Sequence, residues 1–552
     1  MRVLMGLLVV GVAITGTRAV WLGVIRAPAL SAQARDQQER KFEVPAERGD
    51  IVDRNGRVLA QDRLTAKITT TPYLIADPEA VAQRLAPVLG RPPAELEKAL
   101  SGGGGYAVLA PLVDQRTATR VRQLQIPNID VTDTFTRNLP QGMVASQLVG
   151  LVGEDDAHKG QIVGQFGLEQ RYNTQLTGTP GQREEAHDPL GQTLETIKAR
   201  DPIPGKTIHT TIDSTIERRT EEILAETRTQ HSALSANAVV MRPNGDILAM
   251  ASVPRTNPNR RDKLNVDLMR NRPVADTIEP GSTFKIVAIT GALETGAVKP
   301  TTVFDVPAIV ELYDRTLKDS HNEGATRWSV SQILQRSSNK GTYLIAKTLG
   351  ERNFANWIEK FGFGTASGVD VPGEEPGIVP DYTNPEQWSG TSILNLPIGQ
   401  GLTVNQVQLA RAYTAIANGG RLVHPRVVSS VGDTPVPRVA GRRIFSRATA
   451  RKMDAMLRDA VGVGGTGKAA QVEGYEVAGK TGTANKVDPT TGEYTSRYRA
   501  SFVGYLPADN PQLIIAVSVD EPQDIIYGGE VAAPAFEKIA EFAVQQLGIP
   551  PA

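Results

Sequence analysis

The sequence has no cysteine among its 552 residues and only 6 histidines. The absence of cysteine excludes disulfide bonds, thiolate nucleophiles and cysteine-ligated zinc. The histidines show no spacing typical of a metal site. Charge of one sign is not in excess either, because 60 lysines and arginines balance 60 aspartates and glutamates. This balance gives no electrostatic reason to expect nucleic acid as a partner.

The N-terminus carries a long apolar run. Val3–Ile25 is apolar apart from Thr15, Thr17 and Arg18, which is about the length needed to cross a bilayer. We interpret this run as a signal anchor, with a cleaved signal peptide and a buried soluble helix as the alternatives. The few charged residues on either side encode the orientation only weakly.

The length of the chain predicts more than one domain. We expect a cytoplasmic start and membrane anchor at residues 1–27, an extended, β-rich pedestal at residues 28–204 and a larger domain at residues 205–552. Strand patterns begin and end the larger domain, and helical patterns fill its middle. We therefore predict an α+β fold, in which one antiparallel sheet built from distant segments is flanked by helices and carries an all-helical lobe.

One candidate for chemistry follows Pro280 and Gly281, where Ser282-Thr-Phe-Lys285 opens an apolar helix. Residues three apart share one face of a helix, so Lys285 can activate Ser282 as a nucleophile. The free amides at a helix N-terminus favour negative charge there. This spacing alone proves little, because Ser337-Ser-Asn-Lys340 repeats it.

Two further motifs decide between the two serines by their order. A site of this type also needs a hydroxyl and an amide beside the nucleophile, and a cationic strand that binds a carboxylate. Ser337-Ser-Asn339 and Lys480-Thr-Gly-Thr483 both lie downstream only if Ser282 is the nucleophile. Singly, a helix cap, a buried hydrogen-bonding pair and a turn explain the three motifs better. Jointly, their order on helix, loop and strand favours catalysis.

The three motifs resemble those of the penicillin-binding protein and serine β-lactamase superfamily. Further segments are similar to class B penicillin-binding proteins and extend the resemblance over most of the chain: Arg48–Gly56, Phe166–Glu169, Glu279–Ser282, Gly399–Gly401, Gln408–Tyr413 and Val477–Ala484. Three C-terminal segments resemble the septal, cell-division branch more than the elongation branch: Tyr498–Tyr505, Asp520–Gln523 and Tyr527–Gly529.

The resemblance implies a D,D-transpeptidase that cross-links peptidoglycan during cell division and is inhibited by β-lactams. Ser282 would attack the penultimate D-Ala of a pentapeptide stem, and an amine of a neighbouring strand would resolve the acyl-enzyme. Lys285 would be the base, and Ser337 would pass a proton to the leaving amine. Asn339 would hold the stem amide.

The resemblance also implies how the substrate binds. Lys480, Thr481, Gly482 and Thr483 would bind it, largely through its carboxylate. The backbone amides of Ser282 and Thr483 would form the oxyanion hole. No cofactor and no metal are implied. The implied partners are peptidoglycan stem peptides, β-lactams and division-complex membrane proteins including a glycan polymerase. Nucleic acid is not among them. The implied location is the cytoplasmic membrane, with the catalytic domain on its outer side.

Other functions fit the same residues. An elongation-type transpeptidase, a D,D-carboxypeptidase or a β-lactamase would share the fold. However, no class A deacylation motif lies between Asn339 and Lys480, and a plain hydrolase has no need of a long pedestal. The non-enzymatic alternative is a membrane β-lactam sensor or a division scaffold. For the pedestal itself we expect a partner-docking role.

One motif favours a different chemistry but lacks its context. Gly462–Lys468 matches the opening of a phosphate-binding P-loop. Ala469 replaces the serine or threonine that would hold magnesium, and a predicted helix precedes the motif where a P-loop follows a strand. We therefore interpret this segment as an ordinary loop.

Overall fold

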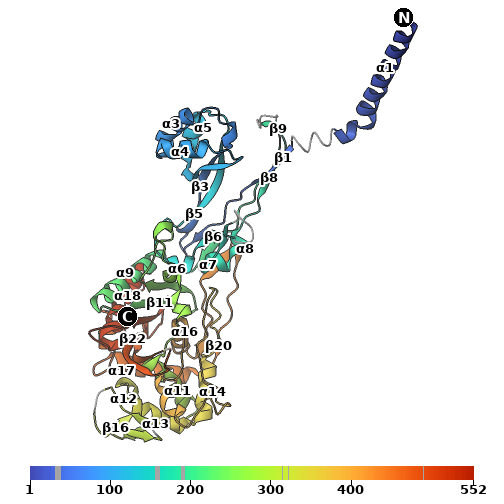
Figure 1. The fold of residues 1–552 in the computed structure, drawn as a ribbon. Coiled ribbons are helices and arrows are strands. Elements are labelled where there is room, and N and C mark those ends of the chain that lie inside the picture. The colour runs from blue at the N-terminus through green and yellow to red at the C-terminus, as the bar shows by residue number, and fades with distance from the viewer. Residues whose placement is uncertain are drawn as a thin grey trace. The chain divides into compact units, whose positions relative to one another are not determined.

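The computed structural model describes residues 1–30, 39–155, 162–187, 193–313, 315–320, 323–488 and 490–551 (Figure 1). The chain forms two compact units. Unit 1 contains residues 1–49, 62–136 and 177–206, and unit 2 contains residues 50–61, 137–176 and 207–552. Both units are thus assembled from separate segments. The predicted domain boundary near residue 204 stays a prediction. Residues 50–61 and 137–176, which precede that boundary, pack within unit 2.

The N-terminal helix α1 (Arg2–Val20) continues as a π-helical turn, η1 (Trp21–Ile25). Together they form a 24-residue apolar segment of which no part is buried in protein. An apolar helix of this length whose side chains are all exposed is unfavourable in water and matches the apolar thickness of a bilayer. The helix therefore fits the predicted membrane anchor.

Unit 1 contains two arrangements of strands, of which the first is antiparallel throughout. In the first, β8 (Gly181–His187) lies between β1 (Glu39–Val44) and β9 (Thr193–Arg200). In the second, β3 (Val58–Thr70) pairs with both β4 (Ala107–Asp114) and β5 (Ile129–Asn138). Three helices share a small apolar core with β3, β4 and β5: α3 (Pro78–Leu89), α4 (Pro93–Leu100) and α5 (Gln115–Gln123).

Unit 2 is built on a five-stranded antiparallel sheet made from distant segments. Its order is β12 (Ile247–Val253), β11 (Ser235–Met241), β23 (Leu513–Asp520), β22 (Tyr494–Leu506) and β21 (Ala478–Val487). All residues of β11, β12 and β23 are buried. Strands covered on both faces need apolar side chains on both, which explains the apolar runs Ala238–Met241, Ile247–Ala251 and Leu513–Val517 within them. The predicted sheet is confirmed.

Helices cover the two faces of this sheet. One core forms where α9 (Ser214–Gln230) and α18 (Gly528–Gln546) pack on it (Figure 1). The other contains α16 (Gln406–Ala417) and α11 (Lys285–Glu294), and it extends into the helical lobe. The lobe consists of α12 (Val330–Gln335), α13 (Asn339–Leu349), α14 (Glu351–Phe361) and α17 (Arg447–Val461).

The remaining elements of unit 2 are short. A further set of strands is β2 (Ile51–Val52), β10 (Ile208–Thr210), β18 (Val428–Val431) and β19 (Thr434–Pro435). The others include β6 (Val152–Glu154), β7 (Ile162–Gly164), α6 (Ser146–Val149), α7 (Gly167–Arg171), α8 (Asn173–Leu176), α10 (Arg272–Ala275), β13 (Val303–Val306), β16 (Thr326–Ser329), β14 (Val310–Leu312), β15 (Arg315–Leu317), α15 (Ser392–Asn395), β17 (Arg421–Leu422) and β20 (Arg442–Arg443).

Two glutamates are buried inside unit 2 on helix α9. Glu217 accepts a hydrogen bond from the Met250 amide at 2.7 Å, and Glu221 accepts one from the Ala145 amide at 3.0 Å and pairs with Arg255. Burial raises the pKa of Glu217 to about 7, against the opposing effects of the Met250 amide and Arg255. Burial and then the charge of Glu217 raise the pKa of Glu221 well above its usual value.

This pair makes the stability of unit 2 depend on pH. Between the ordinary pKa of 4.5 and about 7, folded Glu217 holds a proton that the unfolded chain releases, so the free energy of unfolding falls as the pH rises through that window. Glu217→Gln removes this titration. We expect the loss of stability from pH 5 to pH 8 to shrink by about 2 kcal/mol.

The measurement is urea unfolding followed by tryptophan fluorescence, because Trp328, Trp357 and Trp388 all lie in unit 2. Glu222→Gln is the matched control, since Glu222 is an exposed glutamate on the same helix α9 and pairs with Arg219 at 3.2 Å. An equal pH dependence in the native protein and in Glu217→Gln would contradict the assignment.

Candidate active site

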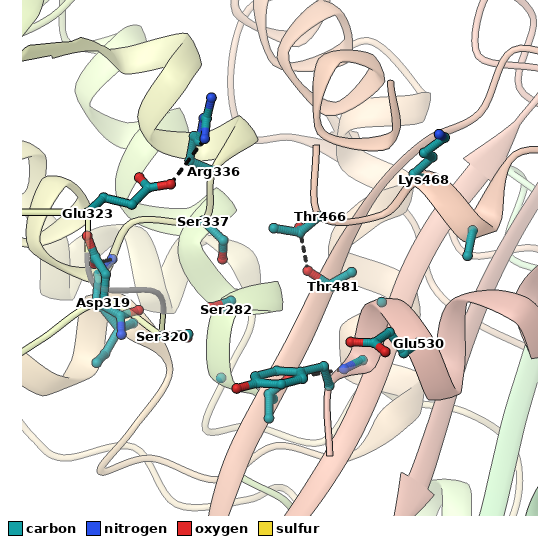
Figure 2. A pocket seen from close by; sticks show the side chains of 18 of the residues that line it. Ser282, Asp319, Ser320, Glu323, Arg336, Ser337, Thr466, Lys468, Thr481 and Glu530 are labelled. Atoms are coloured by element: carbon teal, nitrogen blue, oxygen red, sulfur yellow. Dashed lines mark hydrogen bonds and ion pairs between the residues drawn. The ribbon is translucent and has the colours of Figure 1, made fainter. Parts of the chain in front are cut away.

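A cavity of 560 Å³ opens between the five-stranded sheet and the helical lobe of unit 2. Figure 2 shows Ser282, Ser337 and Thr481 around it, with Glu530 and Lys468 on the wall formed by the C-terminal part of the chain. The residues that line it are Gly281, Ser282, Asp319, Ser320, Glu323, Trp328, Arg336, Ser337, Asn339, Ile398, Gln400, Thr466, Lys468, Ala469, Thr481, Thr483, Tyr527, Gly528, Gly529 and Glu530. All three predicted motifs therefore contribute to one cavity.

Ser282 lies in a 3₁₀ turn, η5 (Gly281–Phe284), that leads directly into α11. The hydrophobic core anchors the turn, because Phe284 is fully buried and its ring centroid lies 4.9 Å from that of Phe363. Ser282 itself is half-buried and faces the cavity. The local sequence thus fixes the turn in the core and leaves the hydroxyl-bearing residue accessible.

Two glycines allow the turn of Ser282 to approach strand β21. Gly281 has φ +56°, and a Cβ there would come within 3.0 Å of the Thr483 carbonyl oxygen. A Cβ on Gly482 would come within 2.4 Å of the Ser501 hydroxyl and 3.0 Å of the Pro280 carbonyl oxygen. Side chains at either position would push the turn away from the strand. Gly482 does not line the cavity; it permits this contact, and its role in substrate binding stays a prediction.

Lys285 is completely buried one turn after Ser282. Its Nζ donates to the Ser337 carbonyl oxygen at 2.5 Å, to the Asn339 Oδ1 at 2.7 Å and to the Ser337 Oγ at 3.3 Å. Burial lowers the pKa of Lys285 to about 7, and the charge of Asp319 opposes that shift. A lysine with this pKa is partly neutral at neutral pH and can accept a proton.

Ser337 and Asn339 stand where helix α13 begins. Ser337 has φ +59°, and its hydroxyl and carbonyl both face Lys285. Asn339 is the first residue of the helix and donates through Nδ2 to the Lys318 carbonyl oxygen at 2.9 Å. The predicted hydroxyl and amide therefore meet the amine of Lys285 directly.

Asp319 is a site residue that the sequence does not reveal. Its carboxylate accepts hydrogen bonds from the Asn339 amide at 2.5 Å, the Lys340 amide at 3.1 Å and the Ser338 hydroxyl at 2.9 Å. It therefore caps the N-terminus of α13, where free amides favour a negative charge. No motif or spacing marks it, because it reaches the helix from a separate loop.

Lys340, the lysine of the repeated serine–lysine spacing, has a different task. It is 2% exposed, and its Nζ donates to the Ala308 carbonyl oxygen at 3.0 Å and the Gly324 carbonyl oxygen at 3.3 Å. The same Nζ lies 3.6 Å from Asp319. Through these contacts Lys340 stabilises the loop that carries Asp319.

Lys480 is also completely buried, behind the cavity wall. Its Nζ lies 3.2 Å from both the carbonyl oxygen and the Oγ1 of Thr481, and 3.5 Å from the Thr466 Oγ1. Burial, followed by the nearby charge of Lys285, lowers the pKa of Lys480 well below its usual value. The cavity surface in front of it is formed by Thr481 and Thr483, and the Thr483 Oγ1 accepts a hydrogen bond from the Gly528 amide at 3.1 Å.

The segment Gly462–Lys468, which we interpreted as an ordinary loop, also contributes to the site. It joins α17 to the 3₁₀ turn η7 (Lys468–Ala470). Thr466 and Lys468 line the cavity, and the Thr466 and Thr481 hydroxyls lie 2.7 Å apart (Figure 2). The residue of this segment that contacts strand β21 is therefore Thr466, through its hydroxyl.

The N-terminus of α18 completes the wall. Tyr527, Gly528, Gly529 and Glu530 all line the cavity. Across the parts of the chain that the structure describes, no group of three or more histidine, aspartate or glutamate side chains is arranged to hold a metal ion. The cavity lining combines hydroxyl, amide and carboxylate side chains.

Comparisons with known proteins match both halves of the chain. The model for the penicillin-binding protein transpeptidase domain matches residues 236–541, and that for the penicillin-binding protein dimerisation domain matches residues 43–210. The probable peptidoglycan D,D-transpeptidase PbpC of Pseudomonas aeruginosa is 33% identical over 97% of this chain and 93% of its own. The peptidoglycan D,D-transpeptidase FtsI of Escherichia coli is 30% identical over 99% of this chain and 92% of its own.

A solved structure matches the fold as well. Penicillin-binding protein 3 of Mycobacterium tuberculosis in complex with aztreonam superposes with a TM-score of 0.71 at 29% identity, over 93% of this chain and 98% of its own. Sequence and fold thus point to the same relatives.

The role of Asp319 can be tested by Asp319→Asn. Removing the negative charge leaves Lys285 with less electrostatic support for its ammonium, so we expect the pKa of Lys285 to fall below about 7. The weaker cap of α13 should also cost about 1 kcal/mol of stability. NMR titration of isotope-labelled lysine Nζ groups, assigned with Lys285→Met, measures the pKa.

Glu323→Gln is the control, because Glu323 lines the same cavity but pairs with Arg336 at 3.1 Å. A pKa of Lys285 that is unchanged or higher in Asp319→Asn would refute this electrostatic assignment.

Proposed function

The chain belongs to the class B penicillin-binding proteins, and from this membership and the cavity we propose that it is a peptidoglycan D,D-transpeptidase with Ser282 as its nucleophile. One observation carries the residue assignment. The buried amine of Lys285 lies one turn from Ser282 and within hydrogen-bonding distance of Ser337 and Asn339. A neutral amine in that position can take the proton of the nucleophile and return it through neighbouring groups.

The proposed reaction has two steps. In the first, the Ser282 Oγ attacks the carbonyl carbon of the penultimate D-Ala while Lys285 takes its proton, and the peptide bond to the terminal D-Ala breaks. Ser337 passes a proton to the leaving amine. In the second, an acceptor amine attacks the ester of Ser282, the new peptide bond forms and the serine regains its proton.

Strand β21 holds the substrate in this proposal. Thr481 and Thr483 line the cavity and bind the terminal carboxylate through their hydroxyls, while the buried amine of Lys480 holds the Thr481 Oγ1 from behind at 3.2 Å. The amides of Ser282 and Thr483 form the oxyanion hole, since the two glycines bring these segments together. Asn339 holds the stem amide.

We propose that residues 28–204 form the pedestal and residues 205–552 the transpeptidase domain. The matches of the dimerisation and transpeptidase models support this division. The apolar helix over residues 2–25 supports a single-pass anchor in the cytoplasmic membrane, with the catalytic domain on the outer side where peptidoglycan lies. The pedestal then has surface available for membrane partners such as a glycan polymerase.

The nucleophile is tested by labelling the full chain in detergent with a fluorescent penicillin, which acylates the serine of such sites. Ser282→Ala should reduce covalent labelling at least about a thousandfold, because the bond-forming oxygen is missing. Ser331→Ala on neighbouring α12 removes a hydroxyl outside the cavity and should label like the native protein. Undiminished labelling of Ser282→Ala, or rapid hydrolysis of the penicillin by the native protein, would refute the proposal.

The septal role is a separate proposal that rests on the likeness of Tyr498–Tyr505, Asp520–Gln523 and Tyr527–Gly529 to the division branch. A fluorescent fusion of the full chain should gather at the division site in dividing cells. The same fusion lacking residues 28–200 tests whether the pedestal directs it there. An even distribution of the intact fusion along the cell envelope would favour the elongation role instead.

A further inference from the structure

Glu279 lies three residues before Ser282 and makes contacts that the proposed reaction does not use. Its Oε1 accepts hydrogen bonds from the Gly401 amide at 2.8 Å and from the Tyr494 hydroxyl at 3.0 Å. Its Oε2 is buried and has no hydrogen-bond partner among the residues that the structure describes. Burying a carboxylate oxygen without a partner is unfavourable, so the two hydrogen bonds to Oε1 are needed to stabilise the Glu279 carboxylate in this position.

The first donor belongs to a loop that touches the turn of the nucleophile. The Gly281 amide donates to the Gly399 carbonyl oxygen at 3.0 Å. Gly399 has φ +79°, and a Cβ there would come within 2.1 Å of the Gly281 carbonyl oxygen. Gln400, between Gly399 and Gly401, lines the cavity. The contact from Glu279 to Gly401 therefore fixes a loop that supports Ser282 and forms part of the cavity wall.

The second donor belongs to the hairpin that carries the substrate-binding strand. Tyr494 is the first residue of β22 and pairs with Val487 at the end of β21. The side chain of Tyr494 is 48% exposed, so little packing holds this end of the hairpin. Its hydroxyl bond to Glu279 joins the hairpin to the segment that leads into Ser282.

Neither Glu279 nor Tyr494 lines the cavity. They are connected to the cavity through other residues. The Glu279 Oε1 joins the segment that leads into Ser282 to the Gly399–Gly401 loop and to the β21–β22 hairpin. Charge strengthens these bonds, since hydrogen bonds to an ionised acceptor are stronger than those to a neutral one.

We propose that Glu279 is a positioning residue that sets the separation between the nucleophile turn and strand β21. This inference rests on the proposed function, since that separation matters only if Ser282 attacks a substrate held by Thr481 and Thr483. A misplacement of a fraction of an ångström between nucleophile and bound carbonyl slows attack strongly while leaving binding nearly intact.

The variants are Glu279→Gln, which keeps the shape and removes the charge, and Tyr494→Phe, which removes only the hydroxyl. Glu493→Gln is the matched control, because it removes a carboxylate from the exposed residue next to Tyr494 on the same hairpin. Stopped-flow labelling of the full chain with a fluorescent penicillin separates the dissociation constant of the reversible complex from the acylation rate constant. Thermal unfolding is measured on the same samples.

We expect the acylation rate constant to fall about tenfold in Glu279→Gln and about threefold in Tyr494→Phe, with the dissociation constant changed less than about twofold. Thermal stability should match that of Glu493→Gln. An unchanged acylation rate constant, an equal fall in Glu493→Gln, or a fall in proportion to lost stability would overturn the proposal.

A second measurement keeps this inference separate from the proposed function. Hydrogen exchange of the Gly401 amide should be faster in Glu279→Gln than in Glu493→Gln, whether or not the protein reacts with penicillin. Unchanged exchange at Gly401 would overturn the proposal that the Glu279 carboxylate holds the Gly401 amide. If the native protein fails to label at Ser282 while exchange at Gly401 is faster in Glu279→Gln, then the proposed function is wrong but the contact between Glu279 and the Gly401 loop is supported.

Discussion

The burial of the Lys285 amine is the constraint on which the site depends. An ammonium without water is unfavourable, and the structure meets this by giving the amine three oxygen acceptors from Ser337 and Asn339. Those acceptors are in place only because α13 begins where it does. The carboxylate of Asp319 holds that helix start and also moderates the shift in the pKa of Lys285. One carboxylate thus controls both the geometry and the protonation of the base.

A second constraint is the close approach of two backbones. The turn of Ser282 and strand β21 come so near that Gly281 and Gly482 have no room for a Cβ. The hydroxyls of Thr481 and Thr483 then share one cavity with Ser282. The turn before α11 and strand β21 are separate elements, and the glycines allow the nucleophile on the turn to face the binding strand.

Much of the site could be predicted because motif residues are short-range features. Ser282 and Lys285 share a helical face by spacing alone, and much of the sheet could be predicted because β11, β12 and β23 are largely apolar. Asp319 could not be predicted, because a loop carboxylate that caps a distant helix leaves no periodic trace in the sequence. Thr466 was overlooked for a related reason, since its partner Thr481 lies on another element and only packing joins them.

By itself, the sequence determined the three motifs in their order, the apolar N-terminal helix and the α+β pattern of the larger domain, because these follow from local spacing and hydrophobic periodicity. The order of the motifs already favoured Lys285 as the candidate base, and only the tertiary structure decided what surrounds each amine. Lys285 and Lys340 have the same spacing to a serine, yet the fold directs the Lys285 amine toward Ser337 and Asn339 and the Lys340 amine toward loop carbonyls. The physical reason is that an amine's pKa and partners depend on burial and on contacts between distant segments, which no local pattern encodes.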